Sequence, residues 1–200
     1  MLSAVTEDLR SEAQTDGISN AEDYDRSPSE REFDRLAGEL GELAFARFLE
    51  EQTNFAFEHL GGKTECDFNV EGVEIDVKTR TEIDDNKRDL IVPTDLPDGL
   101  HDMYILLRCV YDEDEMDKQR HKRSIQGIEV IQRWDKETVE EKGEAFNPPQ
   151  VQGRASENYR DTVIVDFEDG DGLLDVIPTI ERMVRETVQL SAEPQAQPAD

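Results

Sequence analysis

A short stretch from Asp67 to Lys78 constrains this chain more than any other part of its sequence. It predicts a β-hairpin with Glu71-Gly72 as a two-residue turn, because alternating polar and apolar residues flank that pair. Strand alternation then separates the side chains into two faces. The apolar face holds Phe68, Val70, Val73, Ile75 and Val77. The polar face holds Asp67, Asn69, Glu74, Asp76 and Lys78, with Asp67 directly opposite Asp76.

The two facing aspartates form a like-charge pair whose Cβ atoms stand about 5 Å apart, which destabilises a sheet unless the charge is neutralised. Carboxylate oxygens are the ligands that Mg²⁺ prefers, with water and phosphate oxygens completing its coordination. Lys78, on the same face, adds a positive charge beside such an ion. The pattern therefore predicts a divalent-cation site suited to phosphodiester hydrolysis. The alternative is a hairpin with one solvated acidic face.

The acidic composition bears on whether DNA can be a partner. The formal net charge is -27 at pH 7 and the pI is near 4.3, whereas proteins that bind nucleic acid usually carry a basic footprint. The acids are spread along the chain, which is typical of proteins from a salt-loaded cytoplasm such as that of haloarchaea. At molar salt the Debye length is only about 3 Å, so this charge does not exclude DNA. An acidic binding module for a basic partner would instead favour clustered acids.

Other classes of site find little support in the cysteines and histidines. Cys66 and Cys109 have neither a disulfide pattern nor a metal-binding spacing, and we expect two buried thiols in a reducing compartment. His59, His101 and His121 have no spacing typical of a zinc site or a triad base. The sequence also lacks an apolar run of about 18 residues and a signal peptide, which predicts a soluble cytoplasmic protein.

The remaining patterns predict an α/β fold in which a mixed sheet is flanked by helices. A capping box at 27–30 starts a helix that ends near Gln52, with Glu42 enclosed among small and apolar neighbours. Trp134 is expected in the core. Strands are expected at 102–110, 124–131 and 161–167, and helices at 136–144 and 173–189. The organisation is a flexible acidic tail at 1–26, one domain at 27–190 and a disordered tail at 191–200.

A family resemblance adds to this pattern. Asp67, followed after eight residues by Asp76-Val77-Lys78-Thr79 and preceded by a helix with Gly41-Glu42, resembles the PD-(D/E)xK nuclease superfamily. The likeness is to halophilic archaeal or archaeal-virus members and spans about residues 30–180, although only 67–80 is specific. It implies a restriction-endonuclease-like fold with an αβββαβ core. One departure is Cys66, which stands before Asp67 where the motif has proline.

The resemblance also implies roles for individual residues. Glu42, Asp67 and Asp76 would hold Mg²⁺ or Mn²⁺, Lys78 would be the catalytic lysine, and Glu39 is the substitute for Glu42. The expected activity is that of a metal-dependent DNA nuclease, a phosphodiester hydrolase acting as an endonuclease or exonuclease. Its partner would be DNA and not a membrane, with a homodimer as one option for the assembly.

Basic side chains in so acidic a chain are candidates for contacts to the DNA backbone. They are Arg80 beside the motif and Lys118, Arg120, Lys122 and Arg123 in the run 118–123, with Lys87, Arg88, Arg154 and Arg160 as further candidates. The run 118–123 could equally pair with the acids of 112–117 as a solvated ribbon.

The rival function is a non-catalytic DNA- or protein-binding module on the same fold. A dispersed, solvated arrangement of the four motif side chains would favour the module. Convergence of Glu42 with the acids of the hairpin would favour the enzyme.

Overall fold

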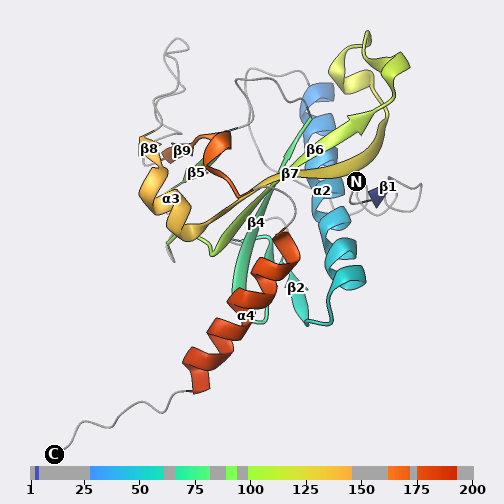
Figure 1. Ribbon diagram of the computed structural model, residues 1–200. Helices are drawn as coiled ribbons and strands as arrows, with labels where there is room; N and C mark the ends of the chain where they lie inside the picture. The colour runs from blue at the N-terminus through green and yellow to red at the C-terminus, as the bar shows by residue number, and fades with distance from the viewer. Residues whose placement is uncertain are drawn as a thin grey trace, which may run out of the picture.

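The computed structural model describes residues 3–4, 28–60, 66–81, 89–93, 99–145, 162–171 and 175–192. The fold is mixed α/β, with helices packed on a six-stranded sheet that has a second, three-stranded sheet beside it (Figure 1). Most of the predicted tails, 1–26 and 191–200, lies outside the described residues. Within the part of the chain that is described, no helix combines the length and apolar character needed to cross a membrane.

The large sheet has the strand order β1-β7-β6-β4-β3-β2. Its neighbours pair antiparallel except β4 and β6, which are parallel. Its strands are β1 (Ser3–Ala4), β2 (Phe57–His59), β3 (Phe68–Val70), β4 (Val73–Arg80), β6 (Met103–Tyr111) and β7 (Ile125–Asp135). The small antiparallel sheet has the order β5-β9-β8, with β5 (Leu90–Pro93), β8 (Glu144–Ala145) and β9 (Thr162–Val165).

The structure has three α-helices and three short 3-10 helices in its described residues. The α-helices are α2 (Pro28–Gln52), α3 (Lys136–Lys142) and α4 (Val176–Ala192). Three short 3-10 helices are η1 (Glu113–Glu115), η2 (Arg120–Lys122) and η3 (Phe167–Asp169). The predicted extent of α2 is confirmed, since the helix starts at Pro28 and ends at Gln52.

The predicted hairpin is confirmed, with the predicted register over residues 68–75, but the predicted pairing of Asp67 directly opposite Asp76 is not among its strand pairs. The facing pairs of β3 and β4 are Phe68/Ile75, Asn69/Glu74 and Val70/Val73. Glu71 and Gly72 have φ angles of 49° and 93°, the left-handed values that a two-residue hairpin turn of type I′ requires. Asp67 lies just before β3 and donates its N–H to the Ile75 carbonyl at 3.1 Å.

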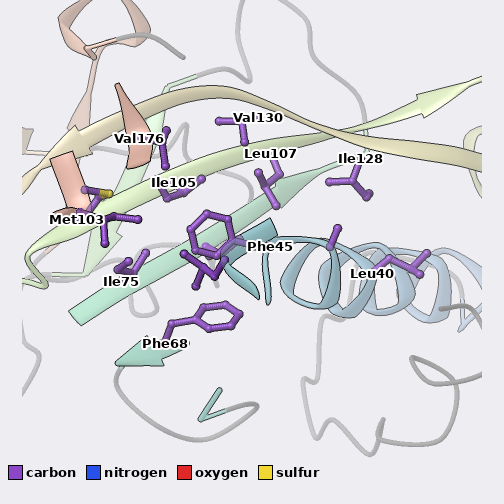
Figure 2. Packing of buried hydrophobic residues seen from close by; sticks show 14 of the residues in the cluster. Leu40, Phe45, Phe68, Ile75, Met103, Ile105, Leu107, Ile128, Val130 and Val176 are labelled. Atoms are coloured by element: carbon purple, nitrogen blue, oxygen red, sulfur yellow. The ribbon is translucent and has the colours of Figure 1, made fainter. Parts of the chain in front are cut away.

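The apolar face of the hairpin packs beneath α2 and α4. Phe45 of α2 is fully buried and meets Phe68 edge to face, with ring centroids 5.3 Å apart. Figure 2 shows Phe45 pointing from the helix toward the sheet, among Ile75 and Ile105. Burying a side chain of this size contributes roughly 1.5–3 kcal/mol. This face of the large sheet therefore provides the main core.

The opposite face of the large sheet is covered by the small sheet. Tyr104, Leu106 and Trp134 pack there against Leu90, Val92 and Val165 of β5 and β9. Figure 1 shows α2 on one side of β6 and β7 and the strands β5, β8 and β9 on the other. Trp134 is fully buried, as the sequence predicts.

Several element boundaries differ from those predicted. β7 runs on to Asp135, β9 ends at Val165 before η3, and α4 spans Val176–Ala192 rather than 173–189. The strands β1, β2, β5 and β8 are not predicted. Each has two to four residues, and unlike β3, which is as short as β2, none stands beside a recognisable two-residue turn. β1 forms inside the predicted flexible tail, since Ser3 and Ala4 pair with the edge of β7.

Candidate functional site

The site begins where α2 touches β4. A Cβ atom on Gly41 would lie 1.9 Å from Thr79 Oγ1, so only glycine lets the helix backbone come this close to the strand. β3 pairs only with Val73–Ile75, and the rest of β4 extends beyond that strand. Glu42 is the residue after Gly41 in this helix, one position along from the contact.

Asp67 occupies the place next to β4 that a longer β3 would have taken. Its Oδ2 accepts a hydrogen bond from the Val77 N–H at 2.6 Å. Burial, followed by the carboxylates of Asp76 and Glu42, raises the pKa of Asp67 to about 6. Asp76 and Glu42 therefore lie near enough to Asp67 for their charges to disfavour its ionised form.

Asp76 is the most enclosed of the acids. Its exposed fraction is only 6%, and its Oδ1 accepts a hydrogen bond from Lys78 Nζ at 2.7 Å. Its Oδ2 is also buried but accepts no hydrogen bond from any residue that the structure describes. A buried acceptor left without a partner costs about 1–3 kcal/mol, and more when it is charged. A bound cation would remove that cost.

Lys78 supplies the positive charge of the site. Burial lowers the pKa of Lys78, but the neighbouring carboxylates, Asp76 above all, raise it by more, so the pKa lies above its ordinary value. The side chain is therefore an ammonium ion at neutral pH. The Lys78 side chain is 41% exposed, whereas the side chain of Asp76 is 8% exposed. Lys78 therefore contacts the buried Asp76 carboxylate while part of its side chain remains in contact with solvent.

Glu42 is oriented by His59, a residue for which the sequence predicts no role. His59 Nε2 lies 2.9 Å from Glu42 Oε2, and the imidazole stacks on Phe68 with ring centroids 4.6 Å apart. The three-residue strand β2 places His59 there by pairing it with Phe68. A strand this short leaves no pattern in the sequence, so only a pairing partner could have identified it.

Glu42, Asp67, Asp76 and Lys78 therefore lie near enough for their charges to act on one another. The oxygens of the three carboxylates do not, however, all come within 4.8 Å of one another. Donor atoms of this kind fit a hard divalent cation, because carboxylate oxygens are the protein ligands that Mg²⁺ and Mn²⁺ prefer. The buried, unpartnered Asp76 Oδ2 is the observation on this chain that supports such an ion. Asp67 and Glu42 would complete the protein ligands.

The basic run 118–123 has local partners in the structure. Lys118 Nζ lies 2.6 Å from Glu115 Oε1. The Arg123 guanidinium donates to the carbonyls of Lys118 and Met116, and it lies over the Tyr111 ring at 5.7 Å from the centroid. These contacts match the alternative in which the run pairs with the preceding acidic segment.

The remaining candidate DNA contacts are Arg80, Lys122 and several residues outside the described part of the chain. Arg80 extends β4 beyond the motif and donates to the Asp89 carbonyl at 3.4 Å. Lys122 is exposed. The side chain of Arg120 and the residues Lys87, Arg88, Arg154 and Arg160 lie outside the described part of the chain.

A second group of side chains, which the sequence analysis did not bring together, lies next to the acidic site. One ligand atom each from Cys66, Glu74 and His101 lies within 4.8 Å of the others. His101 Nδ1 is 3.3 Å from Glu74 Oε2. Burial and the neighbouring acids, Glu74 first, raise the pKa of the Cys66 thiol to about 11. The parallel pairing of β4 with β6 brings His101 here, and no spacing in the sequence reveals that pairing.

Comparisons with protein-family models, with curated proteins and with solved structures give no significant match for this chain. The family resemblance of the hairpin therefore remains a prediction. The function has to be inferred from the arrangement of the side chains.

Proposed function

We propose that this protein is a Mg²⁺- or Mn²⁺-dependent DNA nuclease of the PD-(D/E)xK type, on a restriction-endonuclease-like fold. The observation that carries the proposal is the buried Asp76 carboxylate, whose Oδ1 accepts a hydrogen bond from Lys78 Nζ and whose Oδ2 has no partner among the described residues. The charges of Asp67 and Glu42 act on the same lysine. A solvated acidic face on a hairpin does not require an acid from a distant helix. Nor does it require a carboxylate as buried as that of Asp76.

The three carboxylates would hold the cation, with Asp76 Oδ2 as the most enclosed donor. When bound, the cation lowers the pKa of water and offsets negative charge on the phosphate. His59 fixes the orientation of Glu42 through their hydrogen bond. The Val77 N–H does the same for Asp67. These contacts reduce the movement needed when the site is loaded.

Lys78 has the properties of a group that stabilises charge in the transition state. Its pKa is raised, so it carries a proton at neutral pH. Its partial exposure lets the ammonium reach a phosphate at the surface while one hydrogen bond to Asp76 holds it in place. A positioned cation is most effective where negative charge develops, on the non-bridging phosphate oxygens.

An acidic enzyme needs a way to bind a polyanion. Each phosphate neutralised by a side chain gives a slope of about -0.9 in log affinity against log salt on B-DNA, so such contacts weaken steeply at high salt. We therefore expect recognition by shape and by the bound cation, with weak sequence preference. Few basic side chains among the described residues are candidates for phosphate contacts, which is consistent with this expectation.

The test is cleavage of labelled single-stranded, duplex and branched DNA at molar KCl with Mg²⁺ or Mn²⁺. The variants are Asp76→Ala and Lys78→Ala, and the matched control is Glu58→Gln, which removes an exposed charge from β2 outside the site. Each protein is first checked for folding by circular dichroism. Metal-dependent cleavage by wild type and control that is lost in both variants supports the proposal.

No cleavage of any substrate by a folded wild-type protein would overturn the proposal. If all four proteins then bound DNA equally, the non-catalytic binding module would replace it. Cleavage that persists in Asp76→Ala would also contradict the assigned site.

A further inference from the structure

The cluster of Cys66, Glu74 and His101 joins three segments that the proposed nuclease site depends on. Cys66 immediately precedes Asp67, and Glu74 lies on β4 two residues before Asp76. His101 lies just before β6, the parallel neighbour of β4. The cluster is therefore adjacent to the acidic site but shares no residue with it.

The donor atoms of the cluster differ in kind from those of the acidic site. A thiol sulfur, an imidazole nitrogen and a carboxylate oxygen are the ligands that zinc takes in proteins, whereas Mg²⁺ takes oxygens only. Neighbouring carboxylates, Asp67 and Asp76, make the surroundings negative. This combination selects a borderline-soft divalent cation over a hard one.

The spacing of the donor atoms is close to that of a zinc site. With bonds of about 2.3 Å to sulfur and 2.0–2.1 Å to nitrogen or oxygen, tetrahedral ligand atoms stand about 3.3–3.6 Å apart. His101 Nδ1 and Glu74 Oε2 are already 3.3 Å apart. All three ligand atoms lie within 4.8 Å of one another, so rotation of side chains can bring the sulfur into place.

Burial also favours a bound ion over a chance grouping. Cys66 is 6% exposed and His101 is 2% exposed, while the Glu74 side chain is 40% exposed and provides access from solvent. The backbone N–H of His101 donates to Tyr104 Oη at 3.0 Å, which fixes the start of β6 next to the cluster. Ligands held in position by the fold bind a metal with little loss of freedom.

We propose that Cys66, Glu74 and His101 bind one Zn²⁺ ion and that water occupies the fourth position. The ion ties the segment before β3 to β4 and to the start of β6, and so holds Asp67 in place beside Asp76. The proposal does not depend on nuclease activity.

The test is a Co²⁺ titration of metal-free protein in the presence of excess Mg²⁺, which fills the oxygen site. Cobalt replaces zinc with the same ligands, and a bound thiolate gives a charge-transfer band in the near ultraviolet. We expect this band at one equivalent of Co²⁺ in the wild type, with displacement by Zn²⁺. The control variant Cys109→Ala, at the other buried cysteine, should retain it.

Cys66→Ala should lose the band. Zn²⁺ affinity, measured against a chromophoric chelator, should fall by more than the roughly 10- to 100-fold that losing an outer partner of a ligand costs. Glu74→Gln keeps the thiol and a similar shape, so it decides the question if Cys66→Ala does not fold. It should keep a weakened band and lose affinity.

Absence of the charge-transfer band in the wild type would overturn the proposal and leave His101 and Glu74 as a simple ion pair. Equal Zn²⁺ affinity of wild type and Glu74→Gln would overturn it as well. Because the readouts are spectra and affinities, a failure of DNA cleavage leaves the zinc result unaffected.

Discussion

The two faces of β4 come from one short run of residues but are held by opposite physical effects. Val73, Ile75 and Val77 are buried beneath α2 and α4, where removal of apolar surface from water stabilises the fold. On the other face, Asp76 and Lys78 lie among further carboxylates. Bringing like charges together and away from water costs free energy.

This difference explains how an unfavourable group of charges can persist. The aliphatic face and the close contact of Gly41 with Thr79 determine where α2 and β4 lie. Glu42, Asp67 and Asp76 are then held near one another although they repel. If the polar face binds a cation as we propose, substitutions on it should reduce activity, and substitutions on the apolar face should reduce stability.

The largest effect expected from the polar face is on activity. Asp76→Ala should reduce metal-dependent DNA cleavage by about 100- to 1,000-fold or more, or about 3–4 kcal/mol of transition-state stabilisation. In a chelator the free energy of unfolding should not fall by more than about 1 kcal/mol, because the variant removes a buried oxygen that has no partner among the described residues, and Lys78 can be hydrated at its exposed position. Single-turnover cleavage and urea unfolding provide the two measurements. A large loss of stability with cleavage retained would show that Asp76 serves stability and not activity.

The aliphatic face should show the converse. Ile75→Ala leaves a cavity beneath α2, next to Phe45 and Phe68, and should destabilise the protein by about 2–4 kcal/mol. Activity per folded molecule should stay near that of the wild type. Urea unfolding, with cleavage measured well below the transition, tests this expectation. If Ile75→Ala were less destabilising than Asp76→Ala, the apolar face would not be the main source of stability.

The contact that joins the two faces can be tested at Gly41. A Cβ atom there would overlap with Thr79 Oγ1, so Gly41→Ala should push α2 from β4 and destabilise the protein by about 1–3 kcal/mol. Cleavage should also fall, because Glu42 moves with the helix. The matched control is Gly38→Ala in the same helix, which has open space around its Cβ and should be neutral or stabilising by up to about 1 kcal/mol. Equal behaviour of the two variants would contradict the role given to Gly41.

The cost of the polar face should appear in the pH dependence of stability. The pKa of Asp67 is about 6 in the folded chain, against an ordinary 3.8. The folded state thus binds this proton more tightly than the unfolded chain, and without metal the resulting stability is lost as pH rises through 6. Asp67→Asn should therefore be more stable than the wild type by about 1–2 kcal/mol at pH 7 and equal to it below pH 4.

Thermal unfolding in a chelator between pH 4 and pH 7 measures this difference. Asn retains an oxygen to accept the Val77 N–H, so the hydrogen bond is preserved in the variant. A difference between the two proteins that does not change with pH would show that repulsion at Asp67 is not its cause.

The smallest effect is expected away from β4, in the basic run. Lys122→Ala should weaken DNA binding by about two- to threefold at low salt and reduce the salt slope by about 1, with little change at molar KCl. Arg123→Ala should instead destabilise the loop, because its guanidinium holds the carbonyls of Lys118 and Met116. Fluorescence anisotropy at several salt concentrations distinguishes the two outcomes. A salt slope unchanged in Lys122→Ala would exclude a phosphate contact at that residue.

Much of the fold follows from local patterns. The capping-box pattern predicts the start of α2 that is observed at Pro28, although its Ser27 lies outside the described residues, and the alternation around Glu71-Gly72 predicts the hairpin and its register over residues 68–75. The strands that were missed, such as β2 and β5, have only three or four residues. β3 is equally short but is predicted, because the turn Glu71-Gly72 joins it to the longer alternation of β4.

The sequence by itself determined which side chains share a face of β4, since alternation along a strand is a property of the backbone. It also placed Glu42 on the preceding helix and supplied the acids and the lysine. Only the tertiary structure decided which residues meet across elements: Glu42 with His59, and Cys66 with Glu74 and His101. Those meetings depend on how α2 packs and on which strands are neighbours. Both are set by burial over the whole chain and not by any local spacing.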